Sequence, residues 1–202
     1  YTPKEKSIYK DIYKLQPGCS LTFDLSKRTH VVQKFWKILS DKKKFQLNLN
    51  ENQILDQLDK CLEEAVNLQL NSDVPLAILL SGGLDSSLIT SIASRSHDNL
   101  NTFTVSFAGH GFFDEAPHAE LISNTYKTHH HVVEAKNINP EIISTLTHYV
   151  DDPMFDPSII PSFLVAQSIS KKFKVALSGD GGDELFGGYN HYAKLIKLKK
   201  IS

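Results

Sequence analysis

Residues 81–87 combine the groups that a polyphosphate-binding loop needs, in the order Ser-Gly-Gly-Leu-Asp-Ser-Ser. Adjacent glycines let the backbone turn sharply and expose amide N–H groups, and the serine hydroxyls add further hydrogen-bond donors. The carboxylate of Asp85 would repel phosphate, so its presence indicates a Mg²⁺ ion between the two groups. The segment has no Lys and is therefore not a Walker A loop. The simpler alternative, a tight Gly-Gly turn with a helix cap at Asp85 or Ser86, leaves the cluster of hydroxyls unexplained.

A second segment near the end of the chain concentrates acidic residues. Residues 178–184 read Ser-Gly-Asp-Gly-Gly-Asp-Glu, which places Asp180, Asp183 and Glu184 among glycines. Carboxylate oxygens are the ligands that Mg²⁺ prefers. Asp85 and Asp183 are therefore candidates for one shared Mg²⁺-pyrophosphate site. The alternative interpretation is a solvated surface loop.

Both segments follow apolar stretches that predict β-strands. Strands are predicted over residues 76–80, 102–107, 131–133 and 173–177, and helices over 86–95 and 114–126. Further helices are predicted to open near Pro140, near Ser158 and after Asp183. Strands that alternate with helices are typical of an α/β fold with a parallel sheet covered by helices on both faces. Because ligands bind at the carboxyl ends of such strands, we expect the two segments to share one edge of the sheet.

The chain divides into three predicted parts. In residues 1–38, Leu21, Phe23 and Leu25 alternate with polar residues before a turn, which predicts a hairpin with a half-buried strand. We expect this hairpin to end a domain that begins upstream. Residues 39–72 predict a charged linker and an amphipathic helix over 51–70, and residues 73–202 hold the α/β part.

Composition excludes several classes of partner. The sequence has 22 Lys and Arg against 23 Asp and Glu, a formal net charge of -1, so no basic excess predicts binding to nucleic acid or to an anionic membrane. The longest apolar run, residues 74–80, is far shorter than the roughly 20 residues of a membrane-spanning helix. We therefore expect small-molecule partners, no nucleic acid and no membrane.

Cysteine and histidine do not predict a metal centre. Cys19 and Cys61 are too few for a disulfide scaffold or a thiolate zinc cluster, which favours a cytoplasmic protein, and Cys61 is expected to be a buried helix residue. His129–His131 are consecutive on a predicted strand, so they cannot all face one ion.

The motifs resemble those of a known family. Residues 81–87, SGGLDSS, resemble the pyrophosphate loop of the N-type ATP pyrophosphatases, and residues 178–189, SGDGGDELFGGY, resemble the matching segment of the asparagine synthetase family. The Phe113–Glu115 motif followed by His129–His131, and the Asp151–Ser158 segment, are similar to other patterns of that family. Residues 1–18 look like the last strands of its glutaminase domain. The resemblance therefore covers nearly the whole chain.

The resemblance implies a fold and a reaction. The fold would be adenine nucleotide alpha hydrolase-like, preceded by the end of a glutaminase-type domain over residues 1–38. The reaction would be ATP-dependent amide formation through an acyl-adenylate and pyrophosphate, most simply from aspartate to asparagine, with ammonia from glutamine. ATP and Mg²⁺ are the implied cofactors, and a homodimer of the full-length protein is a further expectation. Other acceptors, such as a surface sugar or a β-lactam precursor, and a non-catalytic nucleotide-binding module stay open as alternatives.

The resemblance also assigns roles to individual residues. It implies that Asp85 and Asp183 bind Mg²⁺, that Asp180 occupies the position of a Glu that handles the ammonia proton, and that Tyr189 borders the same pocket. The implied nucleotide-binding residues are Leu79, Ser81, Gly82, Gly83, Asp85, Ser86, Ser87, Val105, Ser178 and Gly179.

Two departures limit what carries over. Residue 1 is Tyr, where glutaminase members have a nucleophilic Cys, and the family's late Lys lies beyond the matching region, so we expect this chain by itself to be inactive. Residues 157–160 read Pro-Ser-Ile-Ile, where some asparagine synthetases have Thr-Thr-x-Arg. An Arg there would pair with a substrate carboxylate, so its absence puts aspartate in doubt.

Overall fold

The computed structural model describes residue 2 and residues 5–37, 49–109, 111, 114–135, 140–150 and 156–199. The chain forms two compact units, one made of Tyr1–Asn50 with Glu141–Pro157 and the other of Glu51–Pro140 with Ser158–Ser202. Each unit has its own architecture. Most of the predicted linker, residues 39–48, lies outside the described residues.

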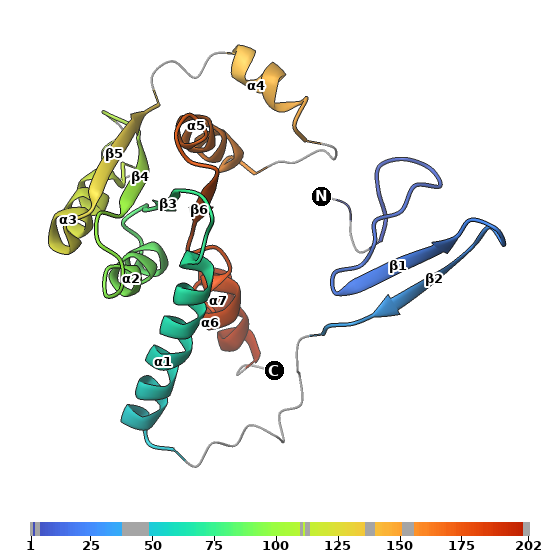
Figure 1. The fold of residues 1–202 in the computed structure, drawn as a ribbon, viewed down its shortest axis with the longest axis horizontal. Helices are drawn as coiled ribbons and strands as arrows, with labels where there is room; N and C mark the ends of the chain where they lie inside the picture. The colour runs from blue at the N-terminus through green and yellow to red at the C-terminus, as the bar shows by residue number, and fades with distance from the viewer. Residues whose placement is uncertain are drawn as a thin grey trace. The chain divides into compact units, whose positions relative to one another are not determined.

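The second unit is built on a four-stranded parallel sheet (Figure 1). Its strands are β3 (Leu76–Leu79), β4 (Asn101–Ser106), β5 (His129–Glu134) and β6 (Val175–Leu177). Their order, β5-β4-β3-β6, confirms the parallel α/β fold expected from the sequence. The chain leaves β3 to build β4 and β5 on one side and returns to build β6 on the other. This reversal creates a crevice at the carboxyl ends of β3 and β6, where open α/β sheets bind their ligands.

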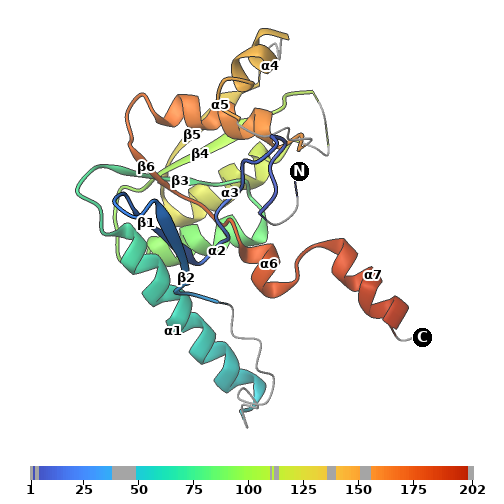
Figure 2. The ribbon, with the colours of Figure 1, turned by 90° about the vertical axis from the view of Figure 1, so that its right-hand side faces the viewer.

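Helices cover both faces of this sheet. Figure 2 shows α5 (Ile159–Ile169) on one side, and α2 (Leu84–Ala93) and α3 (Ala116–Tyr126) on the other. Successive residues of β3 point to opposite faces of the sheet. Ile78 packs with α2 and with α1 (Glu51–Leu70), whereas Ala77 packs with α5. The members of the first apolar cluster are Val66, Leu70, Ile78, Ile92, Ala93 and Leu100. Those of the second are Ala77, Phe103, Val165, Ile169 and Phe173. The prediction of helices on both faces is confirmed.

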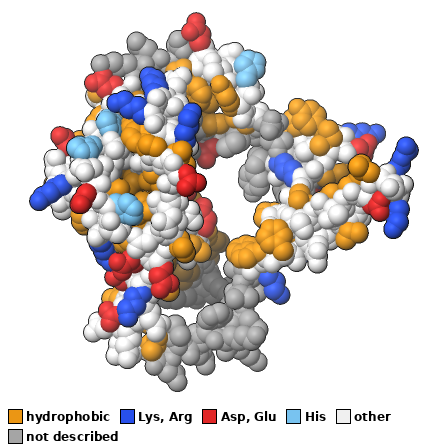
Figure 3. Space-filling view, viewed as in Figure 1, with side chains coloured by type: hydrophobic (Ala, Val, Ile, Leu, Met, Phe, Trp, Pro, Cys, Tyr) orange, Lys and Arg blue, Asp and Glu red, His pale blue; other side chains and the backbone are white. Residues whose placement is uncertain are grey.

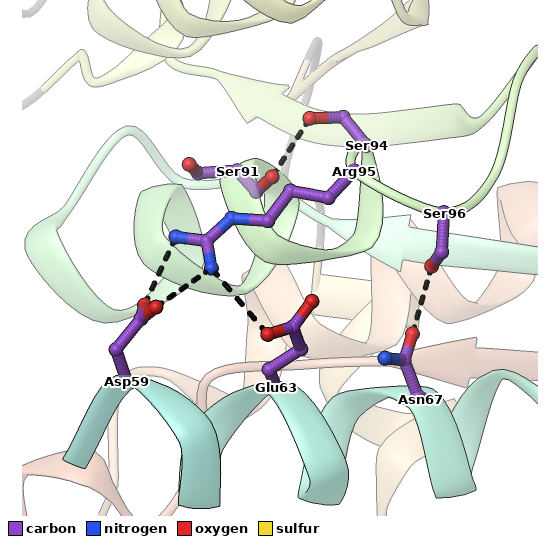
Figure 4. A network of polar contacts seen from close by, with 7 residues as sticks. All are labelled: Asp59, Glu63, Asn67, Ser91, Ser94, Arg95 and Ser96. Atoms are coloured by element: carbon purple, nitrogen blue, oxygen red, sulfur yellow. Dashed lines mark hydrogen bonds and ion pairs between the residues drawn. The ribbon is translucent and has the colours of Figure 1, made fainter. Parts of the chain in front are cut away.

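A polar contact joins α1 to the residues that follow α2 (Figure 4). Both Arg95 guanidinium nitrogens lie 3.0 Å from the Asp59 carboxylate, and Glu63 lies 3.9 Å away. One turn further along α1, Asn67 Oδ1 accepts a 2.7 Å hydrogen bond from Ser96. The predicted helix over 51–70 is confirmed, but Cys61 is exposed rather than buried, because the face of α1 that packs on the core carries Leu62, Val66 and Leu70.

In the first unit, the predicted hairpin is present as β1 (Cys19–Asp24) and β2 (Thr29–Lys34). Asp24 Oδ1 accepts 2.9 Å hydrogen bonds from the N–H groups of Ser26 and Lys27, which stabilises the turn. The prediction that one face is half-buried is wrong for the described residues, because Leu21 and Phe23 are 49% and 51% exposed. Figure 3 shows hydrophobic side chains on the surface of the hairpin. An isolated pair of strands offers cross-strand contacts but no second layer.

Three elements begin or pack differently from expectation. Helix α2 begins at Leu84 rather than Ser86, because Gly83 already has the extended backbone of a residue that precedes a helix. The β6 strand is an edge strand and is largely exposed rather than buried. Short helix α6 (Gly182–Phe186) contains Asp183 instead of following it, and α7 (Asn190–Lys199) comes next.

Helix α4 (Pro140–Leu146) opens with the predicted proline.

None of the helices in the described ranges is long and apolar enough to span a membrane.

Candidate functional site

Hydrogen bonds within the loop between β3 and α2 hold its shape. The Ser86 hydroxyl accepts a 3.2 Å bond from the Ser81 N–H, lies 3.0 Å from the Ser81 hydroxyl and donates to the Gly83 carbonyl at 3.3 Å. The Ser81 hydroxyl accepts a 3.2 Å bond from the Gly83 N–H. Two of the predicted phosphate-binding hydroxyls therefore also organise the loop that carries them.

Ser87 is different, because its hydroxyl is buried and has no hydrogen-bond partner among the described residues. Leaving such a group unpaired costs about 1–3 kcal/mol. It lies in the first turn of α2, whose N-cap residue Gly83 makes no side-chain cap. The first N–H groups of a helix have no partner within it and favour an anion. The first N–H groups of α2 are therefore available to a ligand, whereas the Ser87 hydroxyl is enclosed by protein.

Gly82 fixes the loop against α3. It has a positive φ of 82°, and a β-carbon there would lie 2.7 Å from both His118 Cβ and the backbone nitrogen of Ala119. Only glycine tolerates both the backbone conformation and this close approach. The loop therefore rests directly on the first turn of α3.

Asp85 brings the two motifs together. A β-carbon on Gly179 would lie 2.9 Å from Asp85 Cβ, and one on Gly182 would lie 2.5 Å from Asp85 Oδ2. The Asp85 carboxylate thus lies over Gly182, the residue before Asp183. The Asp183 carboxylate contacts Gly188, and its carbonyl accepts hydrogen bonds from the Gly187 and Gly188 N–H groups. The expected meeting of the segments at one edge of the sheet is present.

A cavity of about 850 Å³ opens between the two motifs. The predicted site residues that line it are Leu79, Ser81, Gly83, Asp85, Ser86, Ser178, Gly179, Asp180, Asp183 and Tyr189. All charged side chains of its described lining are carboxylates. Two carboxylates completed by phosphate oxygens suit Mg²⁺, which usually keeps few protein ligands. In the described part of the chain, no three His, Cys, Asp or Glu residues are grouped for a metal held by protein alone.

A second cavity of about 220 Å³ lies beside the first, at the carboxyl ends of β3 and β4. Val105 lines it, and Leu79 and Ser81 line both cavities. Phe103, Phe107 and Val165 give it an apolar wall. Gly82 and Ser87 line neither cavity. Of the residues predicted to bind adenosine, Val105 and Gly179 are therefore separated between the two cavities, with Leu79 between them.

The two predicted catalytic residues have different partners. Asp180 is exposed, and its carboxylate accepts a 2.9 Å hydrogen bond from the Ser178 hydroxyl. The Tyr189 hydroxyl donates a 2.7 Å bond to Glu184. This bond raises the pKa of Tyr189 to about 12 and lowers the pKa of the Glu184 carboxyl. Tyr189 therefore stays protonated at neutral pH.

Sequence reasoning missed the pairing of Glu184 with Tyr189. The sequence identifies Glu184 as an acidic residue of its segment but does not predict which side chain it contacts. The pair of glycines between α6 and Tyr189, Gly187 and Gly188, could have indicated that the chain turns back there. Gly187 has a positive φ of 72° and lets the chain fold back, so that residues five positions apart meet.

Comparison with solved structures gives a modest likeness. The NH3-dependent NAD synthetase from Campylobacter jejuni matches with a TM-score of 0.43 and 16% sequence identity, over 70% of this chain and 62% of that chain.

Curated sequences are much closer. The chain is 36% identical, over 94% of its length, to a protein named putative asparagine synthetase [glutamine-hydrolyzing] 2 of Methanocaldococcus jannaschii, and covers 36% of that protein. It is 33% identical, over 98% of its length, to asparagine synthetase [glutamine-hydrolyzing] 1 of Bacillus subtilis, and covers 31% of it. The chain thus spans about a third of these relatives.

The family model described as asparagine synthase matches residues 57–201. This range includes both loops, the whole parallel sheet and the two cavities. The chain therefore belongs to the asparagine synthase family.

Proposed function

We propose that this chain carries the ATP-binding part of an amide-forming ligase that converts aspartate to asparagine, with ammonia derived from glutamine. The observation that carries the proposal is the position of the Asp85 carboxylate over Gly182, next to Asp183. It places Asp85 beside the backbone that leads into Asp183, at the carboxyl ends of adjacent strands, which supports a shared role for the two acids. Family membership supports the same reaction class.

In this proposal the triphosphate of ATP binds at Ser81–Ser87. The first N–H groups of α2 supply donors, and their geometry is fixed before the ligand arrives. The adenosine binds by Leu79, Val105 and Gly179. Asp85 and Asp183 would hold Mg²⁺, which would supply positive charge to stabilise the pyrophosphate that leaves.

The chemistry takes place in the larger cavity. An oxygen of the substrate carboxylate attacks the α-phosphorus of ATP, and pyrophosphate leaves with the electrons of the broken P–O bond. Ammonia then attacks the acyl carbon, AMP leaves and a proton passes from nitrogen to a base. Asp180 is the proposed base, because its carboxylate lines the cavity and is oriented by the Ser178 hydroxyl.

Tyr189 takes a supporting role. With a pKa of about 12 it donates a hydrogen bond rather than accepting a proton at neutral pH. Its hydroxyl holds the ionised Glu184 in the wall of the same cavity. The pair therefore shapes the part of the cavity wall formed by α6 and the residues after it.

The test uses the full-length protein with ATP, Mg²⁺, ammonia and aspartate, and measures AMP, pyrophosphate and asparagine. Equal amounts of all three support the proposal. Pyrophosphate release with another carboxylic acid, but not with aspartate, would keep the chemistry and replace the acceptor. The assay with other carboxylic acids is needed because residues 157–160 lack the Arg that some asparagine synthetases have there. No pyrophosphate with any acid would favour the non-catalytic nucleotide-binding module.

Other features of the full-length protein stay predictions from the sequence. They are the glutaminase-type domain that ends near residue 38, the homodimer, the absence of nucleic-acid and membrane partners, and the cytoplasmic location.

A further inference from the structure

Asp114 lies outside the two loops of the candidate site, in the Phe113–Glu115 motif, and it connects β4 to α3. Its Oδ2 atom accepts a 3.0 Å hydrogen bond from the hydroxyl of Ser106, the last residue of β4. Its Oδ1 atom accepts bonds from the N–H groups of Phe107, at 3.2 Å, and Ala116, at 3.3 Å. Ala116 is the first residue of α3. One carboxylate therefore fixes the end of a central strand to the start of the next helix.

The start of α3 supports the loop that is proposed to bind ATP. His118 and Ala119 in its first turn leave no room for a β-carbon on Gly82. Ala119 is fully buried, so this turn cannot shift without disturbing the packing. Glu115, the residue after Asp114, lines the 220 Å³ cavity. The position of Asp114 is thus connected to both the phosphate and the adenosine sides of the proposed site.

We propose that Asp114 is a positioning residue for ATP: its carboxylate holds the first turn of α3 where Gly82 can rest, and so sets the conformation of the Ser81–Ser87 loop. The inference rests on the proposed function, because it assumes that this loop binds ATP. Asp114 itself touches no substrate. Its effect passes from the carboxylate through Ala116 and the first turn of α3 to Gly82.

A purely structural role would have a different consequence. Asp114 would then stabilise the fold as any helix-start residue does, and its loss would lower the melting temperature without a specific change in ATP affinity. Ser123, near the other end of α3, offers a matched control. Its hydroxyl donates a 3.2 Å bond to the Thr128 carbonyl and lies 2.8 Å from the Thr128 hydroxyl. It is buried, and removing it disturbs the same helix about one turn beyond the residues that contact Gly82.

The experiment compares the full-length wild-type protein with Asp114→Ala, Asp114→Asn and Ser123→Ala. ATP binding in the presence of Mg²⁺ is measured by calorimetry, and KM and kcat are measured well below each melting temperature. We expect Asp114→Ala to weaken ATP binding about tenfold or more, the size of effect that a small misplacement of binding groups can produce. Asp114→Asn keeps one acceptor oxygen and should restore part of the affinity. The KM for the carboxylate acceptor should change little, and Ser123→Ala should bind ATP as the wild type does.

Two results would overturn the inference. One is wild-type ATP affinity in Asp114→Ala, and the other is an equal loss of affinity in Ser123→Ala. If Asp114→Ala does not fold, Ser106→Ala removes only one of the hydrogen bonds described for Asp114 and should show a smaller loss in the same direction. Wild-type affinity there would also count against the inference. If the wild-type protein itself binds no ATP, the proposed function fails, and this inference fails with it.

Discussion

The backbone of Gly179 lies against Asp85 so closely that no β-carbon fits between them. This contact joins the loop after β6 to the first turn of α2. It means that the two motifs of the candidate site form one packed unit rather than two neighbouring loops.

Replacing Gly179 should therefore separate the motifs. In Gly179→Ala the new β-carbon would lie 2.9 Å from Asp85 Cβ and the Ser86 nitrogen, and neither atom can move without moving α2. We expect a loss of about 1–3 kcal/mol in the free energy of unfolding, as for other overpacked sites, and loss of ATP-dependent pyrophosphate release.

A denaturant melt and a pyrophosphate assay measure these two effects. Gly83→Ala is the comparison, since its β-carbon would meet only the Ser81 hydroxyl, at 3.2 Å, and its φ of -69° suits alanine. If the two variants were equally stable, close packing at Gly179 would not be the cause.

The charges of Asp85 and Asp183 should matter more for turnover than for folding. Asp85→Asn and Asp183→Asn keep the side-chain shape but remove a carboxylate from the proposed Mg²⁺ site. Turnover with Mg²⁺ and ATP should fall about 100-fold or more, as when a group that stabilises developing charge is removed. Asp56→Asn, an exposed acid on α1, serves as the control. Circular-dichroism melts should be similar for all three variants, and unchanged turnover in both site variants would refute the assignment.

Removing the Tyr189 hydroxyl should alter the pH profile. The hydrogen bond from Tyr189 lowers the pKa of Glu184, so the carboxylate stays ionised to lower pH than an ordinary Glu. In Tyr189→Phe the pKa of Glu184 should rise toward its ordinary value. If ionised Glu184 supports activity, the acidic limb of the kcat/KM profile should move to higher pH.

Tyr192→Phe, which removes a neighbouring phenol hydroxyl, should leave that limb in place. An identical profile for wild type and Tyr189→Phe would show that Glu184 does not need this bond.

His130 should make stability depend on pH. Burial lowers the pKa of its imidazole in the folded protein, with a smaller opposing effect from Glu120 on α3 and a lowering effect from His131. The unfolded chain therefore binds a proton more readily, and stability should decrease as pH falls through the ordinary His pKa of about 6.5 toward the lower folded value. The imidazole Nδ1 lies 2.9 Å from the Thr102 hydroxyl, and no described residue pairs with Nε2.

His130→Gln should remove part of this dependence. Urea midpoints at about pH 7.5 and about pH 5.5 bracket the titration. The difference between them should be smaller in His130→Gln than in the wild type or in His129→Gln, which changes an exposed residue of the same strand. Equal differences in all three proteins would assign the effect to other groups.

Much of the second unit could be predicted from the sequence because periodicity determines it. The apolar run of β3 and the β-branched and aromatic residues of β4 indicate strands, and the rule for carboxyl ends brings together the segments that carry Asp85 and Asp183. The start of α2 was placed too late because the backbone of Gly83, not a side-chain cap, opens the helix. Leu21 and Cys61 are also more exposed than the sequence predicts. Periodicity identifies which face of an element is apolar, but it does not say whether another element covers that face.

The electrostatics of the larger cavity have a consequence for the order in which ligands enter. Since the charged side chains of its described lining are all carboxylates, the cavity should repel a free carboxylic acid. A divalent cation that arrives with the nucleotide would offset part of this negative charge and weaken the repulsion of the acid. We therefore expect ordered binding, with the metal–nucleotide complex first and the acceptor second, so that the acceptor reaches the cavity only when the phosphate to be attacked is already there.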